Sequence, residues 1–259
     1  MVAVSQIPQA NGCSAQEWAV RVDLAAAYRL VDMMGWSDGT GTHLSARAPG
    51  TEHHFLLNPY GMLFDEITAS SLIKVDLDGN ALTESDFEVN PAGFTIHSAV
   101  HMSDPDLECV MHTHTTAGTS VATQKDGLLP INQHALQVLY TVAYHDYEGP
   151  ATNHDERTRI VANLADNRVL ILRNHGLLTV GKTIGEAFVW MYRAERACRM
   201  QLAFQQCGAE LSPISEEVQQ ISMERARVFA SSNGHRPTGK LEWPAWKRRL
   251  DRHGLSYQT

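Results

Sequence analysis

Apolar positions at the start of the chain recur with helical spacing. Ser14 and Glu17 form a capping box, a pair whose side chains can accept hydrogen bonds from the first free backbone N–H groups of a helix. The apolar residues that follow at this spacing are Trp18, Val22, Ala25, Ala26, Leu30 and Met34. Gly35 is a suitable end, because glycine readily adopts the left-handed conformation that closes helices. The pattern predicts a helix over residues 14–34, preceded by a loose N-terminal arm over residues 1–13.

Short strands and further helices are predicted between residues 37 and 208. The polar, glycine-rich stretch 37–43 predicts a loop. Apolar runs bounded by turn signals predict strands at 55–58, 73–77, 108–111, 169–172 and 177–180. Capping residues and periodicity predict helices at 90–103, 115–123, 153–165 and 183–207. Because these elements do not alternate as βαβ units throughout, we expect one α/β domain with a mostly antiparallel sheet covered by helices.

The segment after residue 210 has a different character. From Ser231 onward it carries several glycines and prolines, followed by a basic segment with two tryptophans, Trp243 to Arg249. We expect residues 211–259 to form a C-terminal helical arm that packs on the body or on a neighbouring subunit. The basic residues of this arm are interpreted as a solvated helix face, because the chain as a whole is acidic; the alternative is a patch that binds an anion or nucleic acid.

Composition and charge exclude several classes of protein. The 259 residues carry a formal net charge of -8, whereas a general nucleic-acid binder needs a basic face. No apolar run approaches the roughly 18 residues of a membrane-spanning helix, and no secretory signal pattern opens the chain. The four cysteines form no CxxC pair, which favours a reducing compartment, and we expect a cytoplasmic protein. Thirteen histidines are a surplus, and histidine is the commonest metal ligand among side chains.

The strongest chemical signal is the sequence His112-Thr113-His114. Alternate side chains of an extended segment share one face, so both imidazoles can bind the same ion. His175 lies in a tight turn between two apolar strands, where Gly176 allows close approach. Three histidines suit Zn²⁺ with one coordination position left open, and the same set fits Mn²⁺ or Fe²⁺. The alternative is a polar strand end with two solvated histidines.

A second histidine pair, His97 and His101, is spaced i and i+4 on a predicted helix. That spacing can also bind a metal, but no glutamate lies between the two in the metalloprotease pattern. We interpret them as helix-face histidines or as neighbours of the site rather than as ligands.

The sequence resembles the class II aldolase/adducin family over roughly residues 14–210. The resemblance is carried by four motifs: Gly39-Thr40-Gly41-Thr42-His43-Leu44-Ser45, Leu57-Asn58-Pro59-Tyr60-Gly61, Val110-Met111-His112-Thr113-His114 and Leu172-Arg173-Asn174-His175-Gly176-Leu177. It implies a three-layer α/β/α fold with a mostly antiparallel central sheet. It also implies a four-fold symmetric homotetramer with active sites at subunit interfaces. A divalent metal, Zn²⁺ above Mn²⁺ or Fe²⁺, is then expected on the histidines that match His112, His114 and His175.

The chain departs from the family pattern where sugar-phosphate aldolases carry their catalytic glutamate. That position is Gly93, and glycine cannot abstract a proton. Pro91 and Ala92 replace two serines that help to hold phosphate, and Tyr60 replaces a threonine. The phosphate site of the family is therefore largely missing, and this segment is more similar to the adducin head branch.

Other residues are candidates for binding substrate or replacing the glutamate. His43 stands where the family often has asparagine, and with Asn58, Gly61 and Arg173 it is expected to bind substrate. Arg173 can pair with a substrate carboxylate or with a structural acid. Two residues are expected to be catalytic, Tyr144 and His134. Tyr144 matches a tyrosine proton donor from a neighbouring subunit, with a surface aromatic residue as the alternative.

Three functions remain open from the sequence. The first is a divalent-metal-dependent lyase for retro-aldol cleavage or decarboxylation of a small, non-phosphorylated hydroxy or keto acid. The second is a non-haem iron oxygenase on the same three histidines. The third is a non-catalytic, adducin-head-like assembly module. The expected partners are a small-molecule substrate and other copies of the chain, with no nucleic acid and no membrane.

Overall fold

The computed structural model describes residues 13–50, 53–149, 155–231, 233–254 and 256–259. The predicted N-terminal arm, apart from Cys13, lies outside these residues. The described helices are α1 (Ala15–Met33), α2 (Pro91–Ser103), α3 (Thr116–Ala122), α4 (Gln133–Leu139), α5 (Glu156–Leu164), α6 (Ile184–Cys207), α7 (Glu216–Ala230) and α8 (Glu242–Asp251). The described strands are β1 (His43–Arg47), β2 (Phe55–Leu57), β3 (Ile73–Val75), β4 (Cys109–Thr113), β5 (Val142–His145), β6 (Val169–Leu172) and β7 (Gly176–Gly181).

The seven described strands form one sheet in the order β3-β2-β1-β4-β7-β6-β5. Every neighbouring pair is antiparallel except β5 and β6, which run parallel. The prediction of a mostly antiparallel sheet is therefore confirmed. The central pairs place His43 opposite His112 and Thr113 opposite Leu177, so β1 and β7 flank the strand that carries the predicted metal ligands.

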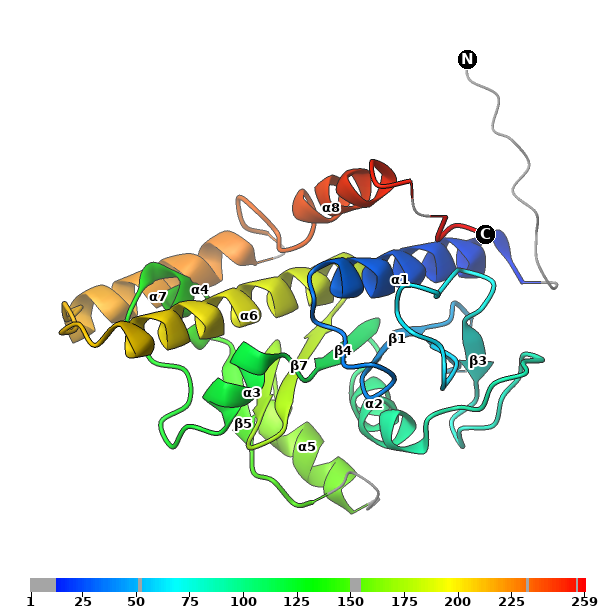
Figure 1. Cartoon of the computed structure of the whole chain (residues 1–259), viewed down its shortest axis with the longest axis horizontal. Coiled ribbons are helices and arrows are strands. Elements are labelled where there is room, and N and C mark those ends of the chain that lie inside the picture. The colour runs from blue at the N-terminus through cyan, green and yellow to red at the C-terminus, as the bar shows by residue number, and fades with distance from the viewer. Residues whose placement is uncertain (1–12, 51–52, 150–154, 232, 255) are drawn as a thin grey trace.

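Helices cover both faces of the sheet (Figure 1). Side chains alternate along β4: Cys109 and Met111 join the core cluster that includes α1 and α6. Val110 joins a separate cluster on the opposite face, built with α2 and α5. This alternation is what a strand buried on both faces requires. The predicted three-layer α/β/α fold is confirmed.

The first helix forms where the pattern predicts it, although its cap differs in detail. Ser14 Oγ accepts a hydrogen bond from the Glu17 backbone N–H at 3.1 Å. The Glu17 carboxylate, however, accepts from Arg21 Nε at 2.9 Å and from Lys74 Nζ at 2.8 Å. Glu17 therefore ties α1 to β3 instead of completing the predicted capping box.

The C-terminal segment packs on the body through α8. Trp243 is buried against Phe188, with ring centroids 5.5 Å apart, and its Nε1 donates to Asp23 at 3.1 Å. A Cβ on Gly185 would lie 2.5 Å from Trp243 Cβ, so only glycine permits this approach. Further along, the Ala69 N–H donates to the Tyr257 carbonyl at 3.0 Å.

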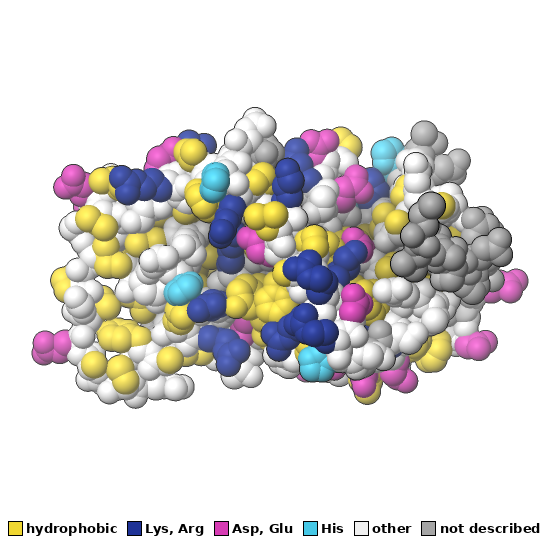
Figure 2. Space-filling model, turned by 90° about the horizontal axis from the view of Figure 1, so that it is seen from above, with side chains coloured by type: hydrophobic (Ala, Val, Ile, Leu, Met, Phe, Trp, Pro, Cys, Tyr) yellow, Lys and Arg dark blue, Asp and Glu magenta, His cyan; other side chains and the backbone are white. Residues whose placement is uncertain are grey.

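The outer face of this segment is mixed in character. Figure 2 shows Lys and Arg side chains among acidic and apolar ones across the face, in keeping with a solvated surface. Helix α7 has no buried residue, and Val218 and Phe229 are about half exposed. Packing of the arm on a neighbouring subunit stays a prediction. Among the helices of the described residues, none combines the length and apolar character needed to cross a membrane.

Candidate metal centre

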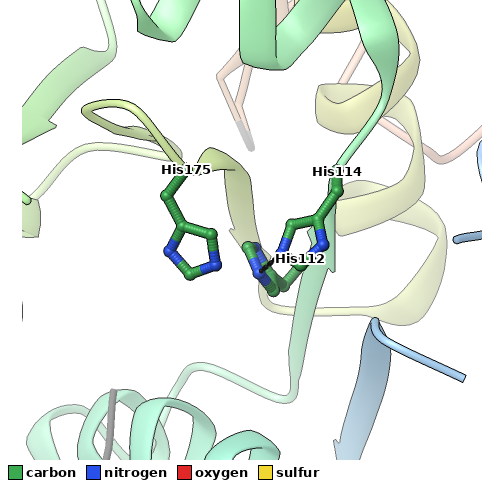
Figure 3. Close-up of side chains that lie close together, drawn as sticks. All are labelled: His112, His114 and His175. Carbon is green, nitrogen blue, oxygen red and sulfur yellow. Dashed lines mark hydrogen bonds between the residues drawn. The ribbon is translucent and has the colours of Figure 1, made fainter. Parts of the chain in front are cut away.

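Three histidines from two strand ends converge on one point (Figure 3). His112 is the last residue but one of β4, His114 follows that strand, and His175 lies in the turn between β6 and β7. One ring nitrogen from each lies within 4.8 Å of the others, and the Nε2 atoms of His112 and His114 are 2.8 Å apart. Gly176 permits this approach, since a Cβ there would lie 2.4 Å from the Thr113 carbonyl oxygen.

Hydrogen bonds from outside the cluster orient two of these rings. His112 Nδ1 lies 3.0 Å from the Leu177 carbonyl oxygen, and His114 Nδ1 lies 3.0 Å from Asp38 Oδ2. Carbonyl and carboxylate oxygens only accept, so each Nδ1 carries the ring proton and each Nε2 presents a lone pair. Partners of this kind typically fix the orientation of metal-binding histidines.

The donor set fits a divalent cation. Two unprotonated nitrogens 2.8 Å apart repel one another, and a shared cation or an added proton relieves that repulsion. Burial holds the pKa of His112 well below its usual range. Burial, with a smaller contribution from His114, lowers the pKa of His175 to about 4. Both effects favour the neutral imidazole, which is the form that binds metal.

His43 lies beside this cluster, as the sequence predicts. Its ring centroid is 5.3 Å from that of His112, and the side chain is almost fully buried. The ring also fills the space next to Gly93, where a Cβ would lie 2.6 Å from His43 Cδ2. The space that a side chain at position 93 would take is thus filled by an imidazole from strand β1.

His43 begins a hydrogen-bonded chain of buried polar side chains between β1 and α2. Its Nδ1 lies 2.8 Å from His97 Nε2, and Ser45 Oγ bridges His97 Nδ1 at 2.6 Å and His101 Nε2 at 2.8 Å. Among the described residues His97 and His101 do not join the metal cluster, in agreement with the interpretation of them as neighbours of the site. The sequence predicted no role for Ser45.

Two other predicted substrate-binding residues have structural contacts. The buried Asn58 Oδ1 lies 2.8 Å from the Tyr28 hydroxyl, which also accepts from the Leu44 backbone N–H at 2.8 Å. Asn58 therefore joins α1 to β1 and β2. Gly61 forms a turn with φ +107°, a conformation that side chains rarely adopt.

Arg173 and Tyr144 contact each other. The guanidinium lies 4.3 Å from the centre of the Tyr144 ring, and its Nη1 donates to the carbonyls of Gln124 and Lys125 at 2.8 and 3.0 Å. The Tyr144 hydroxyl accepts from the Leu128 backbone N–H at 3.0 Å. These contacts hold the loop between α3 and α4 in place. That Tyr144 donates a proton in the site of a neighbouring subunit stays a prediction.

His134 lies in the first turn of α4, a helix that packs against α6 and α7. Burial and the nearby Arg196 lower its pKa. The structure gives it no contact with the three converging histidines, and a catalytic role for it also stays a prediction.

Sequence reasoning missed two residues that support the cluster. Asp38 belongs to the glycine-rich loop that precedes β1, and an acidic residue there does not by itself indicate that its partner is His114. Glu195 could not have been found locally, because it lies on α6, 81 positions beyond His114. Its carboxylate accepts from the Thr115 hydroxyl, and Thr115 Oγ1 accepts from the Gly118 N–H at 3.0 Å, which fixes the start of α3 beside His114.

Comparisons with known proteins agree with this fold. The family profile described as "Class II Aldolase and Adducin N-terminal domain" matches residues 22–202. The chain is 50% identical, over the full length of both proteins, to a Pseudomonas aeruginosa protein named provisionally as an aldolase class 2 protein. It is 46% identical to mouse alpha-adducin over 189 residues, which are 72% of this chain and 26% of the adducin. The L-fuculose 1-phosphate aldolase from Glaciozyma antarctica superposes with a TM-score of 0.81 at 29% identity, covering 95% of this chain and 94% of that one.

Proposed function

Since the chain belongs to the class II aldolase and adducin family, we propose that it is a divalent-metal-dependent lyase acting on a small hydroxy or keto acid. The observation that carries the proposal is the convergence of His112, His114 and His175, with two Nε2 lone pairs oriented by outer partners. Zn²⁺ is the first choice for three imidazoles, and Mn²⁺ or Fe²⁺ also fit. When bound, such an ion supplies Lewis-acid activation of a substrate oxygen.

The substrate is proposed to lack a phosphate group. Gly93 offers no side chain to hold phosphate or to abstract a proton, and the His43 ring occupies the space beside it. Decarboxylation needs no carboxylate base, since the departing CO₂ leaves its electron pair on the remaining fragment. The contacts of Gly93 therefore favour loss of CO₂, with retro-aldol cleavage requiring a different proton acceptor.

Assembly and location follow from the same proposal. We propose a homotetramer in the cytoplasm, with active sites near subunit interfaces where a neighbouring Tyr144 or His134 supplies a proton. Three neutral imidazoles leave the positive charge of a bound cation uncompensated. That charge attracts the carboxylate of a hydroxy or keto acid.

Metal content of the purified protein tests the proposal. Protein prepared without added metal is dialysed against Zn²⁺, Mn²⁺ or Fe²⁺ and analysed by mass spectrometry, beside His114→Ala and the exposed control His235→Ala. We expect about one ion per chain in the wild type and the control, and loss in His114→Ala. Unchanged metal content in His114→Ala would contradict the assignment of His114 as a metal ligand.

Activity assays then separate the reactions. The metal-loaded protein is incubated with a panel of three- to five-carbon hydroxy and keto acids while CO₂ and aldehydes are measured. Oxygen uptake with the Fe²⁺ form, without either product, would favour the iron oxygenase instead.

A non-catalytic assembly module is the second candidate, favoured by the 46% identity to mouse alpha-adducin. It predicts that His114→Ala leaves the oligomeric state unchanged and that no acid in the panel is turned over with any metal. Light scattering of the wild type and His114→Ala addresses the first point directly.

A further inference from the structure

The buried polar chain between β1 and α2 has a defined geometry. His43 and Ser45 are alternate residues of β1 and share one face, while His97 and His101 are four apart on α2 and share another. The hydrogen bonds cross from one element to the other in the order His43, His97, Ser45, His101. The chain ends on the Leu107 carbonyl oxygen, 3.1 Å from His101 Nδ1.

This fixed end determines the direction of every hydrogen bond. A carbonyl only accepts, so His101 Nδ1 carries the ring proton and His101 Nε2 must accept from the Ser45 hydroxyl. Ser45 has no second proton, so its oxygen accepts from His97 Nδ1–H. His97 Nε2 then accepts from His43 Nδ1–H. The order holds for neutral rings, and all three side chains are at least 96% buried.

We propose that Ser45, His97 and His101 are positioning residues that fix His43 as its Nδ1–H tautomer. His43 thereby offers the site a hydrogen-bond acceptor, Nε2, that selects a ligand carrying a hydroxyl donor. Within this series of hydrogen bonds, His43 takes part only through its Nδ1. Its Nε2 lies on the side of Gly93, 3.0 Å from where a Cβ of that residue would be.

The ligand class follows from the properties of this acceptor. An unprotonated imidazole nitrogen is a neutral acceptor, so it favours an alcohol and does not repel a nearby carboxylate as an acidic side chain does. A 2-hydroxy acid combines both groups, whereas a dicarboxylate without a hydroxyl has no proton to donate. This choice of ligand rests on the proposed function, but the tautomer does not.

Nitrogen NMR of ¹⁵N-histidine-labelled protein without metal tests the tautomer. The ring nitrogen shifts and two-bond couplings distinguish a protonated from an unprotonated nitrogen, and we expect Nδ1–H forms for His43, His97 and His101. Ser45→Ala removes the hydroxyl that accepts from His97 Nδ1–H and should abolish this single pattern in His97 and His43. Ser98→Ala is the matched control, because Ser98 is a buried serine on α2 whose hydroxyl donates to the Thr95 carbonyl instead.

Two results would overturn the positioning role. One is His43 carrying its proton on Nε2 in the wild type, and the other is an unchanged pattern in Ser45→Ala. Ser45→Thr retains a hydroxyl and should restore the pattern, which separates loss of the hydrogen bond from general misfolding.

Calorimetry with two probes tests the selectivity. Glycolate has a hydroxyl beside its carboxylate, whereas oxalate at neutral pH has no proton to donate. For zinc-loaded protein, we expect Ser45→Ala to weaken glycolate binding about two- to ten-fold, the value of one hydrogen bond, with oxalate changed less than glycolate. Equal weakening of both probes contradicts the selective acceptor. Failure to bind zinc at all contradicts the proposed function while leaving the NMR result intact.

Discussion

Replacement of Gly93 by alanine should destabilise the protein through a clash with His43. A Cβ at this position would lie 2.6 Å from His43 Cδ2, 2.9 Å from Cγ and 3.0 Å from Nε2. The imidazole has little freedom to retreat, because it is 4% exposed and its Nδ1 is 2.8 Å from His97 Nε2. Either the ring or the first turn of α2 must therefore move.

The magnitude follows from three contributions. Overpacking of a buried site costs about 1–3 kcal/mol. Separation of His43 from His97 would leave a buried nitrogen unpaired, at a cost of about 1–3 kcal/mol. Alanine is the better helix former by up to about 1 kcal/mol. The expected net loss in the free energy of unfolding is about 3 kcal/mol.

Urea unfolding followed by circular dichroism measures this loss in a double-mutant cycle with His43→Ala. Without the imidazole the clash disappears, so Gly93→Ala in the His43→Ala background should be neutral or stabilising by up to about 1 kcal/mol. The reversal of sign is the diagnostic result. Equal destabilisation in both backgrounds, or a neutral effect in the wild type, would refute the reasoning.

Three further predictions concern other buried groups. Burial lowers the pKa of His101 to about 3. In the unfolded protein this histidine binds a proton more readily than in the folded protein. Its contribution to stability is therefore complete above about pH 6.5 and is lost as the pH falls toward 3. Between neutral pH and pH 5.5, the loss in the free energy of unfolding measured in urea should be about 1.3 kcal/mol smaller in His101→Asn than in the wild type, because the other buried histidines with lowered pKa lose stability in both proteins. Thr115→Ala removes the hydroxyl donor to the buried Glu195 carboxylate and the side-chain cap of α3, so the free energy of unfolding should fall by about 1–3 kcal/mol, and Thr115→Ser should recover most of this. Trp243→Ala should cost about 3–5 kcal/mol in the same assay, whereas the exposed Arg248→Ala should change it by less than about 0.5 kcal/mol; equal effects would contradict the described packing of α8.

The cluster of His112, His114 and His175 was predictable because its signals are local. His112 and His114 are separated by one residue on a strand, and His175 follows an unbroken apolar run. The family motifs then indicated that the two segments belong to one site, which the spacing of the histidines alone does not show. Asp38 was a different case, because nothing in the glycine-rich loop indicates which histidine its carboxylate contacts.

Strand β1 was missed for a physical reason. Central strands usually present apolar residues to both faces, but β1 presents His43 and Ser45 to α2. Their burial is satisfied by polar side chains of that helix, so no apolar alternation marks the strand. The hydrophobic pattern of a sequence cannot predict a buried strand whose polar side chains pack against polar side chains of a helix.

The region between α3 and α5 was missed because its elements are short. Helix α4 has seven residues, and its start carries a usable signal, since Asn132 Oδ1 accepts from the Ala135 N–H at 3.0 Å. Strand β5 has four residues and gains its place only by parallel pairing with β6. The contact between Arg173 and Tyr144 and their hold on the loop before α4 could not be predicted either, because they depend on tertiary contacts.

The attachment of segment 257–259 has a consequence for the order of folding. The Ala69 and Ser70 backbone N–H groups donate to the carbonyls of Tyr257 and Thr259, each at 3.0 Å, and the Tyr257 side chain is almost fully buried. These contacts join positions nearly 190 residues apart, and such long loops are slow to close. During synthesis, the backbone N–H groups of Ala69 and Ser70 therefore cannot form these two hydrogen bonds until segment 257–259 has left the ribosome. Removal of segment 257–259 should accordingly slow refolding and expose the 69–70 loop to proteases before the three-histidine cluster is affected.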